Sequence, residues 1–434
     1  MRDLEERERG RSRNRKGQQE KERKRGAVVL AAVFFLVIGV CLGFFMAHVS
    51  YSASGIKKEN GAEKQEILQE QTVIGATEEI SGQETQIEKE NEQESGVKHQ
   101  TEHLQISAGD QETEAKKGKV MVAFAGDIYL SNYVLEAYKK AGDQINGILD
   151  EGFQNQIAQA DWFVANEEFP FSDRGTKAKD KQFTFRLPTE NISIFQKLEL
   201  DLVSLANNHA LDYGTDALLD TCDTLERAGI RYMGVGANLE EAKRPVIMEN
   251  NGVKIGFLGA TRVIPEYSWA AQKDSLGMLE TYNPEILIEK IKEVKTVCDY
   301  VVVYVHWGVE KAVMPEAYQR TMGKQYIDAG ADLVVGSHPH VLQGIEYYKG
   351  KPIVYSLGNF IFGSQIPKTA LLLAEFEEGQ VALRLVPGSS KAGYTAMMTG
   401  EEEKRQFFQE MQEHSFYTQI REDGTVLEQS KEYE

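Results

Sequence analysis

The chain has 434 residues, of which 41% are hydrophobic and 27% are charged, and its formal net charge is −18. This length and apolar content exclude a single small domain and a wholly disordered chain. The negative charge argues against a nucleic-acid-binding protein that works through a basic surface, so no nucleic-acid partner is expected. Three cysteines, none in a CxxC pair, exclude a disulfide scaffold and a thiolate zinc site.

The most hydrophobic stretch lies near the N-terminus. Residues 27–49 contain no Asp, Glu, Lys or Arg, and about 20 apolar residues in a helix span a bilayer. Residues 1–26 carry an excess of Arg and Lys, which stays on the cytoplasmic side of a membrane. We therefore expect a single-pass transmembrane signal anchor at 27–49, a cytoplasmic segment at 1–26, and the rest of the chain outside the cell. A cleaved secretory signal is the alternative, although its apolar core is usually shorter, about 7–15 residues.

Residues 50–118 have the composition of a linker. Segment 52–118 lacks Pro, Phe and Trp and is rich in Glu, Gln, Lys, Ser, Thr and Gly. Because so few apolar side chains cannot offset the entropy lost on ordering, we expect a disordered extracellular stalk. A weak coiled coil around 67–87 is the competing interpretation, but no heptad pattern persists.

A folded domain is predicted to begin near Lys119. Short runs of apolar, often β-branched residues recur along it, a pattern typical of strands buried on both faces. The predicted strands are 120–125, 162–165, 202–206, 253–258, 301–305, 333–335 and 353–357. Predicted helices alternate with them: one after Gly214 that stops at Gly229, one from Pro284 to Cys298, and one over 316–329. The alternation predicts a layered α/β domain.

The C-terminal part has a different pattern. Residues 371–386 predict two strands about a Glu-Gly-Gln turn, an antiparallel pair at the edge of the sheet. Residues 401–414 predict a charged amphipathic helix, and the last fifteen residues are expected to be frayed. Residues 366–434 are thus expected to complete the domain with a hairpin and a helix.

Polar side chains directly follow many of the predicted strands. In open α/β sheets, loops at the carboxyl ends of strands form the ligand crevice. The residues in this position are Asp127, Glu168, Asn208, His209, His306, His338, His340 and Asn359. Any one alone is explained by a cap or a turn. Together they favour one shared site, because imidazole, carboxylate and amide oxygen are the ligands that Mn²⁺, Fe and Zn²⁺ prefer.

Six motifs carry a resemblance to a known family. In chain order they are AGDIYLS (125–131), ANEEFPFSDRG (165–175), SLANNHALDYG (204–214), VHWGVE (305–310), GSHPHVLQG (336–344) and YSLGNFIF (355–362). Their order and spacing resemble the CapA/PgsA family of capsule synthesis, which is similar to calcineurin-like metallophosphatases. The resemblance covers residues 119–365 and implies a four-layer α/β/β/α sandwich with a metal site at one edge.

The resemblance also implies roles for individual residues. His209 would face the substrate as a general acid. One or two divalent ions (Mn, Fe or Zn) would be held by Asp127, Glu168, Asn208, His306, His338 and His340. The chain departs from the enzyme superfamily at Tyr129, where the histidine of the Asp-x-His motif would stand, and at 166–168, where Asn-Glu-Glu replaces the bridging aspartate motif. These departures leave the number of ions open.

Other residues have weaker assignments. Arg186, in FTFRLP, is a candidate clamp for a carboxylate or phosphate, with a surface salt bridge as the alternative. Glu310 is a candidate to orient His306, and Trp307 is predicted to pack in the core. The two cysteines of the folded part, Cys222 and Cys298, are predicted to be small buried hydrophobic residues on helix stripes.

Two functions remain from different classes. The first is a membrane-anchored extracellular metallohydrolase that acts on an anionic cell-surface polymer, poly-γ-glutamate by the resemblance, or on its phosphorylated precursor. The second is a non-catalytic accessory protein that binds or guides such a polymer for a membrane synthase. Residues 119–434 carry a net charge of −15, so any binding of a polyanion has to be local.

Overall fold

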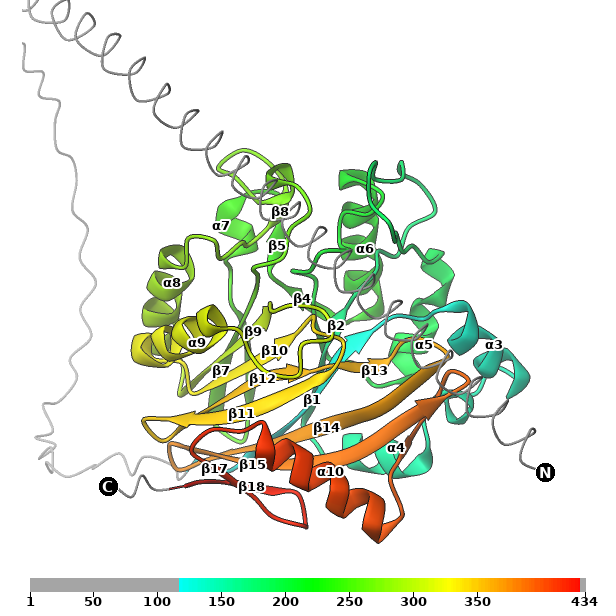
Figure 1. Ribbon diagram of the computed structural model, residues 1–434. Coiled ribbons are helices and arrows are strands. Elements are labelled where there is room, and N and C mark those ends of the chain that lie inside the picture. The colour runs from blue at the N-terminus through cyan, green and yellow to red at the C-terminus, as the bar shows by residue number, and fades with distance from the viewer. Residues whose placement is uncertain (1–116, 430–434) are drawn as a thin grey trace, which may run out of the picture. The chain divides into compact units, whose positions relative to one another are not determined.

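The computed structural model describes residues 117–429 (Figure 1). The predicted cytoplasmic segment, the transmembrane anchor and all but the last two residues of the predicted linker lie outside the described residues. None of the helices that are described has the length and hydropathy needed to cross a bilayer. The described residues belong to one compact unit, 109–434.

Two β-sheets form the centre of this unit. The larger has the strand order β17-β18-β15-β14-β1-β2-β3-β4, with β13 also beside β1 and β16 beside β15. Its strands are β1 (Val120–Ile128), β2 (Trp162–Glu167), β3 (Leu202–Ser204), β4 (Arg231–Met233), β13 (Asn359–Ile361), β14 (Gln365–Glu377), β15 (Gln380–Lys391), β16 (Tyr394–Met397), β17 (Thr418–Ile420) and β18 (Thr425–Glu428). The strands β1 to β4 run parallel, as strands joined by helical crossovers do.

The smaller sheet has the order β11-β12-β10-β9-β7-β6. Its strands are β6 (Val246–Asn250), β7 (Val253–Thr261), β9 (Tyr300–His306), β10 (Leu333–Ser337), β11 (Leu342–Tyr348) and β12 (Lys351–Leu357). A two-stranded pair, β5 (Val235–Gly236) with β8 (Gly277–Met278), lies apart from both sheets. All seven strands predicted from apolar runs are therefore confirmed, in two sheets.

Helices cover the outer faces, so the described unit has four layers, α/β/β/α. On the larger sheet they are α3 (Asn132–Lys140), α4 (Glu151–Ile157), α5 (Ile192–Lys197) and α6 (Thr215–Ala228); on the smaller, α7 (Leu239–Ala242), α8 (Glu285–Lys295) and α9 (Ala317–Ala329). Figure 1 shows α8 and α9 at the left of the sheets and α3, α5 and α6 at the right. Short 3-10 turns are η1 (Ile145–Gly147), η2 (Thr189–Asn191) and η3 (Tyr267–Trp269), and α10 (Glu401–Glu413) packs near β11 and β17.

Each central strand is buried on both faces, which explains its continuous apolar run. Along β1, Val122 and Phe124 enter the core between the two sheets, whereas Ala123 and Ala125 face the helices of the larger sheet. A side-chain period of two makes this alternation automatic. The helix boundaries also follow local rules: α6 ends at Gly229, whose φ of 78° is left-handed and favours glycine.

The C-terminal hairpin corrects one prediction. Strands β14 and β15 pair as predicted, but β14 also pairs antiparallel with β1, so the hairpin is not at the sheet edge. Leu371 and Leu373 pack on the helical side and Leu372 in the core between the sheets. The apolar run indicates that the strand is covered on both faces, but it does not indicate whether a further strand pairs with its free edge.

Two smaller predictions were also wrong. The last fifteen residues are not uniformly frayed, because β17 and β18 form a hairpin that places Val426 in the core. Cys298 does not lie on a helix stripe, because α8 ends at Lys295; the residue is nevertheless buried. Cys222 lies in α6 and is partly buried against the helical side of the larger sheet.

Candidate metal centre

The carboxyl ends of strands from both sheets meet at one place. In the larger sheet, Asp127 of β1 is in register with Asn166 of β2 and with Asn359 of β13. In the smaller sheet, Ser337 of β10 is in register with His306 of β9. All except Asn359, which is partly exposed, are fully buried. The two sheets therefore deliver their terminal polar residues to a common interior.

Two groups of candidate ligands form there, and they share one residue. Glu168, His306 and His338 offer ligand atoms within 4.8 Å of one another, as do Asp127, Glu168 and His340. The Oε1 atom of Glu168 lies 3.7 Å from Nε2 of His306 and 3.8 Å from Nε2 of His340. The Oδ2 atom of Asp127 lies 3.3 Å from Nδ1 of His340. The structure thus brings together five of the six ligands implied by the resemblance around one carboxylate.

The sixth, Asn208, borders the same cluster. Its Oδ1 atom lies 2.7 Å from Nε2 of His306. The opposite nitrogen of that ring, Nδ1, lies 3.0 Å from Oγ of Ser337, and Asn166 Nδ2 donates to Asp127 Oδ1 at 2.8 Å. Amide and hydroxyl groups therefore hold the imidazole and carboxylate side chains in place.

The turn that carries His338 and His340 is strained. Both residues have positive φ, 97° and 59°, which is rare for side chains other than glycine. A neighbouring loop braces the turn, because the backbone N–H of Lys311 donates to the Pro339 carbonyl at 2.7 Å. Strain of this kind persists where the surrounding contacts over-determine a functional geometry. With these backbone angles, the rings of His338 and His340, on either side of Pro339, both lie in the ligand groups that share Glu168.

Burial and mutual charge set the protonation of the cluster. Burial, with the nearby charge of Asp127, raises the pKa of Glu168 well above its usual value. Burial likewise lowers the pKa of His338 to about 4 and that of His306 well below its usual value. Burial opposes the charged form of His340 too, but the carboxylates of Glu168 and Asp127 prevail and raise its pKa to about 10.

These residues fit a divalent cation. Both carboxylate oxygens of Glu168 are buried and, within residues 117–429, have no hydrogen-bond partner. An unpartnered buried carboxylate is costly unless a charge compensates it. The nitrogen and oxygen donors around it are the set that Mn²⁺, Fe and Zn²⁺ accept. Glu167 also has two buried, unpartnered oxygens, but it belongs to neither group of candidate ligands.

His209 lies next to the cluster but outside both groups. Its Nδ1 atom is 2.6 Å from Oδ2 of Asp212 and 3.0 Å from Nζ of Lys181. Lys181 also contacts Asp212 and the Asn208 carbonyl oxygen. The ring of Phe185 stacks on the imidazole with centroids 4.1 Å apart. Burial lowers the pKa of His209, while Asp212 opposes that shift.

Sequence reasoning missed three of these neighbours. Asp212 follows His209 by three residues, so its spacing within NNHALD was a usable signal. Lys181 and Phe185 come from an irregular loop between β2 and η2, which has no periodicity to mark them. Phe185 also stacks on Tyr129, 4.0 Å between centroids, so the residue that replaces the expected histidine is part of an aromatic wall.

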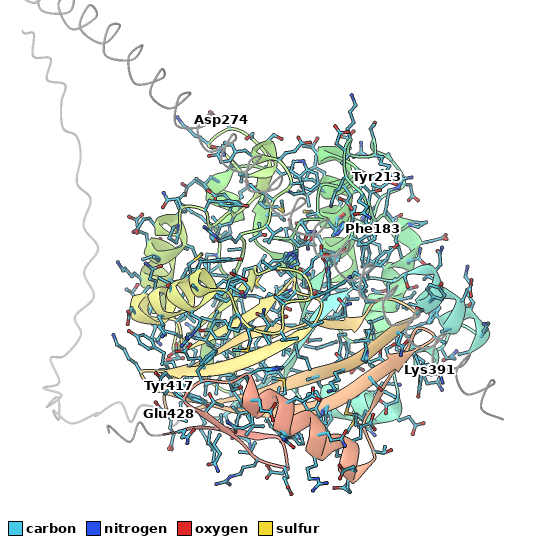
Figure 2. The ribbon with its side chains drawn as sticks, in the orientation of Figure 1. Phe183, Tyr213, Asp274, Lys391, Tyr417 and Glu428 are labelled. Atoms are coloured by element: carbon cyan, nitrogen blue, oxygen red, sulfur yellow. The ribbon has the colours of Figure 1, made fainter. Side chains whose placement is uncertain are left out.

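The weaker candidates lie elsewhere. Arg186 is exposed; its guanidinium stacks over Tyr213, labelled in Figure 2, at 4.1 Å and donates to the Arg174 carbonyl. Its role as an anion clamp stays a prediction. Glu310 is exposed, and the His306 ring nitrogens contact other groups. Trp307 is buried and donates to the Tyr355 carbonyl, which confirms that it packs in the core.

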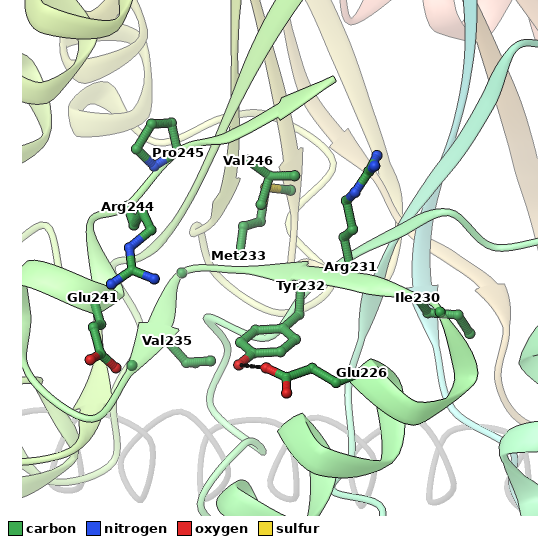
Figure 3. A pocket seen from close by; sticks show the side chains of 13 residues that line it. Glu226, Ile230, Arg231, Tyr232, Met233, Val235, Glu241, Arg244, Pro245 and Val246 are labelled. Atoms are coloured by element: carbon green, nitrogen blue, oxygen red, sulfur yellow. Dashed lines mark hydrogen bonds between the residues drawn. The ribbon is translucent and has the colours of Figure 1, made fainter. Parts of the chain in front are cut away.

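A pocket of about 480 Å³ lies away from the cluster, where the edge strands β4 and β6 meet. Figure 3 shows Tyr232 pointing to one side of β4, where its hydroxyl donates to Glu226, and Arg231 and Met233 to the other. The residues that line it include none of the candidate metal ligands.

Comparison with known proteins identifies a protein family that this chain matches. The sequence model of the protein family described as bacterial capsule synthesis protein PGA_cap matches residues 121–364. The PGA biosynthesis protein CapA of Bacillus subtilis is 36% identical over 243 residues, 55% of this chain and 62% of that protein. The capsule biosynthesis protein CapA of Bacillus anthracis is 31% identical over 307 residues, 68% of this chain and 73% of that protein. The chain thus spans less than two thirds of the Bacillus subtilis relative.

More distant matches were also found. A probable polyglutamine synthesis accessory protein of Mycobacterium tuberculosis is 31% identical over 208 residues, 46% of this chain and 54% of that protein. Among solved structures, the NAD nucleotidase of Haemophilus influenzae has a TM-score of 0.40 and 12% identity, covering 69% of this chain and 64% of that one.

Proposed function

Because this chain belongs to the bacterial capsule synthesis protein family PGA_cap, we propose that it acts in the synthesis of poly-γ-glutamate or a related anionic polymer. Within that process, it acts as a metal-dependent hydrolase of the metallophosphatase type on the polymer or its phosphorylated precursor. The observation that carries this proposal is Glu168, a buried carboxylate common to two groups of metal-ligand side chains.

The side chains around the cluster would have separate roles in metal binding and proton transfer. Asp127, Glu168, His306, His338 and His340 would hold the ion, with Asn208 beside them. A divalent ion supplies positive charge that stabilises the negative charge developing on a phosphoryl or carbonyl oxygen.

His209 would supply the proton. Since its Nδ1 is held by Asp212, its Nε2 is the atom that transfers a proton to the leaving group. Asp212 stabilises the charged imidazolium, and the stacked ring of Phe185 keeps the imidazole in one orientation.

A non-catalytic accessory role is the second candidate. This role is favoured by Tyr129, which occupies the position of a ligand histidine in the enzyme superfamily. Tyr129 stacks on Phe185 instead of offering a nitrogen ligand. The Mycobacterium tuberculosis relative is also described as a probable accessory protein. In this role the cluster binds the anionic polymer locally and guides it for a membrane synthase.

The proposed place of action is the outer face of the cell membrane. The charge-free stretch 27–49 and the basic residues before it support a single-pass anchor with the N-terminus in the cytoplasm. Protease treatment of intact cells tests this: the folded domain should be digested from outside, and its protection would contradict the proposal.

Metal analysis of the full-length chain, followed by assays on phosphomonoester and phosphodiester reporters, separates the two functions. For the enzyme we expect bound metal and turnover that falls about 10²–10⁴-fold in His209→Ala. Metal content should stay unchanged, because His209 belongs to neither ligand group. Asp212→Asn should act in the same direction, whereas Asp216→Asn, an exposed residue in the first turn of α6, serves as the matched control. No turnover with Mn²⁺, Fe²⁺ or Zn²⁺, together with retained polymer binding, would favour the accessory role.

A further inference from the structure

An apolar pocket adjoins the metal cluster. It has a volume of about 260 Å³ and lies between α10, the start of β14 and the turn that carries His340, which itself lines the pocket. The other lining residues are mostly apolar: Val313, Val341, Leu342, Ile366, Pro367, Lys368, Phe407, Glu410, Met411 and His414. The two residues of opposite charge, Lys368 and Glu410, form an ion pair with each other. Neither therefore supplies an uncompensated charge to the pocket.

The loop beside this pocket exposes aliphatic side chains. Val309, Val313 and Met314 are 51%, 46% and 42% exposed, within six residues of one another. The loop is firmly held, since the buried Gln343 donates its Nε2 hydrogens to the Ala312 and Met314 carbonyls at 2.8 and 3.1 Å. Of these three exposed side chains, Val313 lines the pocket, so a braced loop forms part of its wall.

The cluster and the pocket differ sharply in what they accept. The cluster offers a cation site that attracts an anionic group. The adjoining pocket is apolar, so moving a charged group into it from water would cost free energy. Because His340 takes part in both, the pocket lies directly beside the cluster. A free polyglutamate chain carries a carboxylate on every residue and does not match such a lining.

We propose that the pocket binds the aliphatic chain of an amphiphile whose phosphate group lies at the metal cluster. This inference rests on the proposed function in that the cluster binds an anion. It narrows the substrate to a phosphorylated precursor attached to a lipid-like chain. Val313 stands at the exposed side of the pocket and Leu342 at its buried side.

Calorimetric titration with a series of alkyl phosphates tests the proposal. The full-length chain, held in nanodiscs and loaded with Mn²⁺, is titrated with methyl, butyl, hexyl and octyl phosphate, and empty nanodiscs give the background. We expect the Kd to fall about fourfold for each added methylene until the pocket is full. A Kd independent of chain length, or octyl phosphate binding that does not require Mn²⁺, would overturn the proposal.

A matched pair of variants locates the effect. Val313→Asp places a carboxylate beside the pocket at a half-exposed position, so the fold tolerates it. Val297→Asp makes the same change at a residue that is 61% exposed and does not line the pocket. The gain per methylene should fall below twofold in Val313→Asp and stay unchanged in Val297→Asp, with methyl phosphate binding equal in both. Equal gains in the two variants would refute the pocket as the binding site.

The failure of the proposed function gives a different result. If the loaded protein turns over no phosphate ester but the chain-length dependence persists, the hydrolase proposal fails and the amphiphile site stands. If the protein turns over a phosphate ester but its Kd does not depend on chain length, the amphiphile site fails and the hydrolase proposal stands.

Discussion

Replacing Glu168 with glutamine preserves the side-chain volume and removes the carboxylate that both ligand groups share. His338 belongs to one group only and His340 to the other, so neither is equivalent to Glu168. We expect Glu168→Gln to lose metal from the whole cluster, and the single histidine variants to weaken one group each. The neutral amide also removes the buried negative charge, so the metal-free variant should be no less stable than the metal-free parent.

The size of the effect follows from mass action. At a metal concentration 100 times Kd, a bound ion stabilises the folded state by about 2.7 kcal/mol, whereas a 100-fold weaker site gains only about 0.4 kcal/mol at the same concentration. For the 313 residues of the described unit, 117–429, the larger figure corresponds to roughly 4 °C in melting temperature. Mn²⁺ should therefore raise the Tm of the parent by that amount and change the Tm of Glu168→Gln by less than about 2 °C.

Scanning calorimetry with and without Mn²⁺, together with metal analysis of the purified proteins, measures both quantities. The neighbouring Glu167 provides a matched control, because it is equally buried, has no hydrogen-bond partner in the described part of the chain, and also has a pKa raised by burial. It lies in neither ligand group, so Glu167→Gln should keep the full rise in Tm. A full rise in Glu168→Gln, or an equal loss in Glu167→Gln, would refute the assignment of the shared carboxylate.

Two further predictions concern stability without metal. Burial lowers the pKa of His338 to about 4, so its stabilising contribution is complete above the ordinary value near 6.5 and is lost as the pH falls toward 4. Urea denaturation should show the parent losing roughly 3 kcal/mol more than His338→Gln between pH 7.5 and pH 4, and equal losses would contradict this. Lys181→Met leaves the buried Asp212 without its lysine partner and should cost about 3–5 kcal/mol in the same assay. The double variant Lys181→Met/Asp212→Asn should recover much of that loss, whereas simple additivity would show that the two side chains do not interact.

Much of the fold was predictable because its rules are local. A strand buried on both faces needs apolar side chains at successive positions, so runs such as 301–305 in β9 are visible without knowing their neighbours. The end of α6 at Gly229 likewise depends on one residue and its φ angle. The polar residues that follow the strands were visible for the same reason.

Other features depend on contacts between distant parts of the chain. The position of β14 beside β1 was mispredicted, because two strands that pair with each other do not reveal which third strand lies beside them. Lys181 and Phe185 reach His209 from a loop without secondary structure, where no periodic pattern indicates the direction of a side chain.

The amino-acid sequence alone determined the strands with continuous apolar runs, the end of α6 at Gly229 and the chemical groups that follow those strands, since these features depend on a few neighbouring residues. The tertiary structure alone decided that Glu168 joins both ligand groups, that Asp212 and Lys181 flank His209, and that an apolar pocket adjoins His340. These relations arise from the packing of two sheets, the larger built from both ends of the domain and the smaller from its middle, so they depend on contacts that no short segment contains.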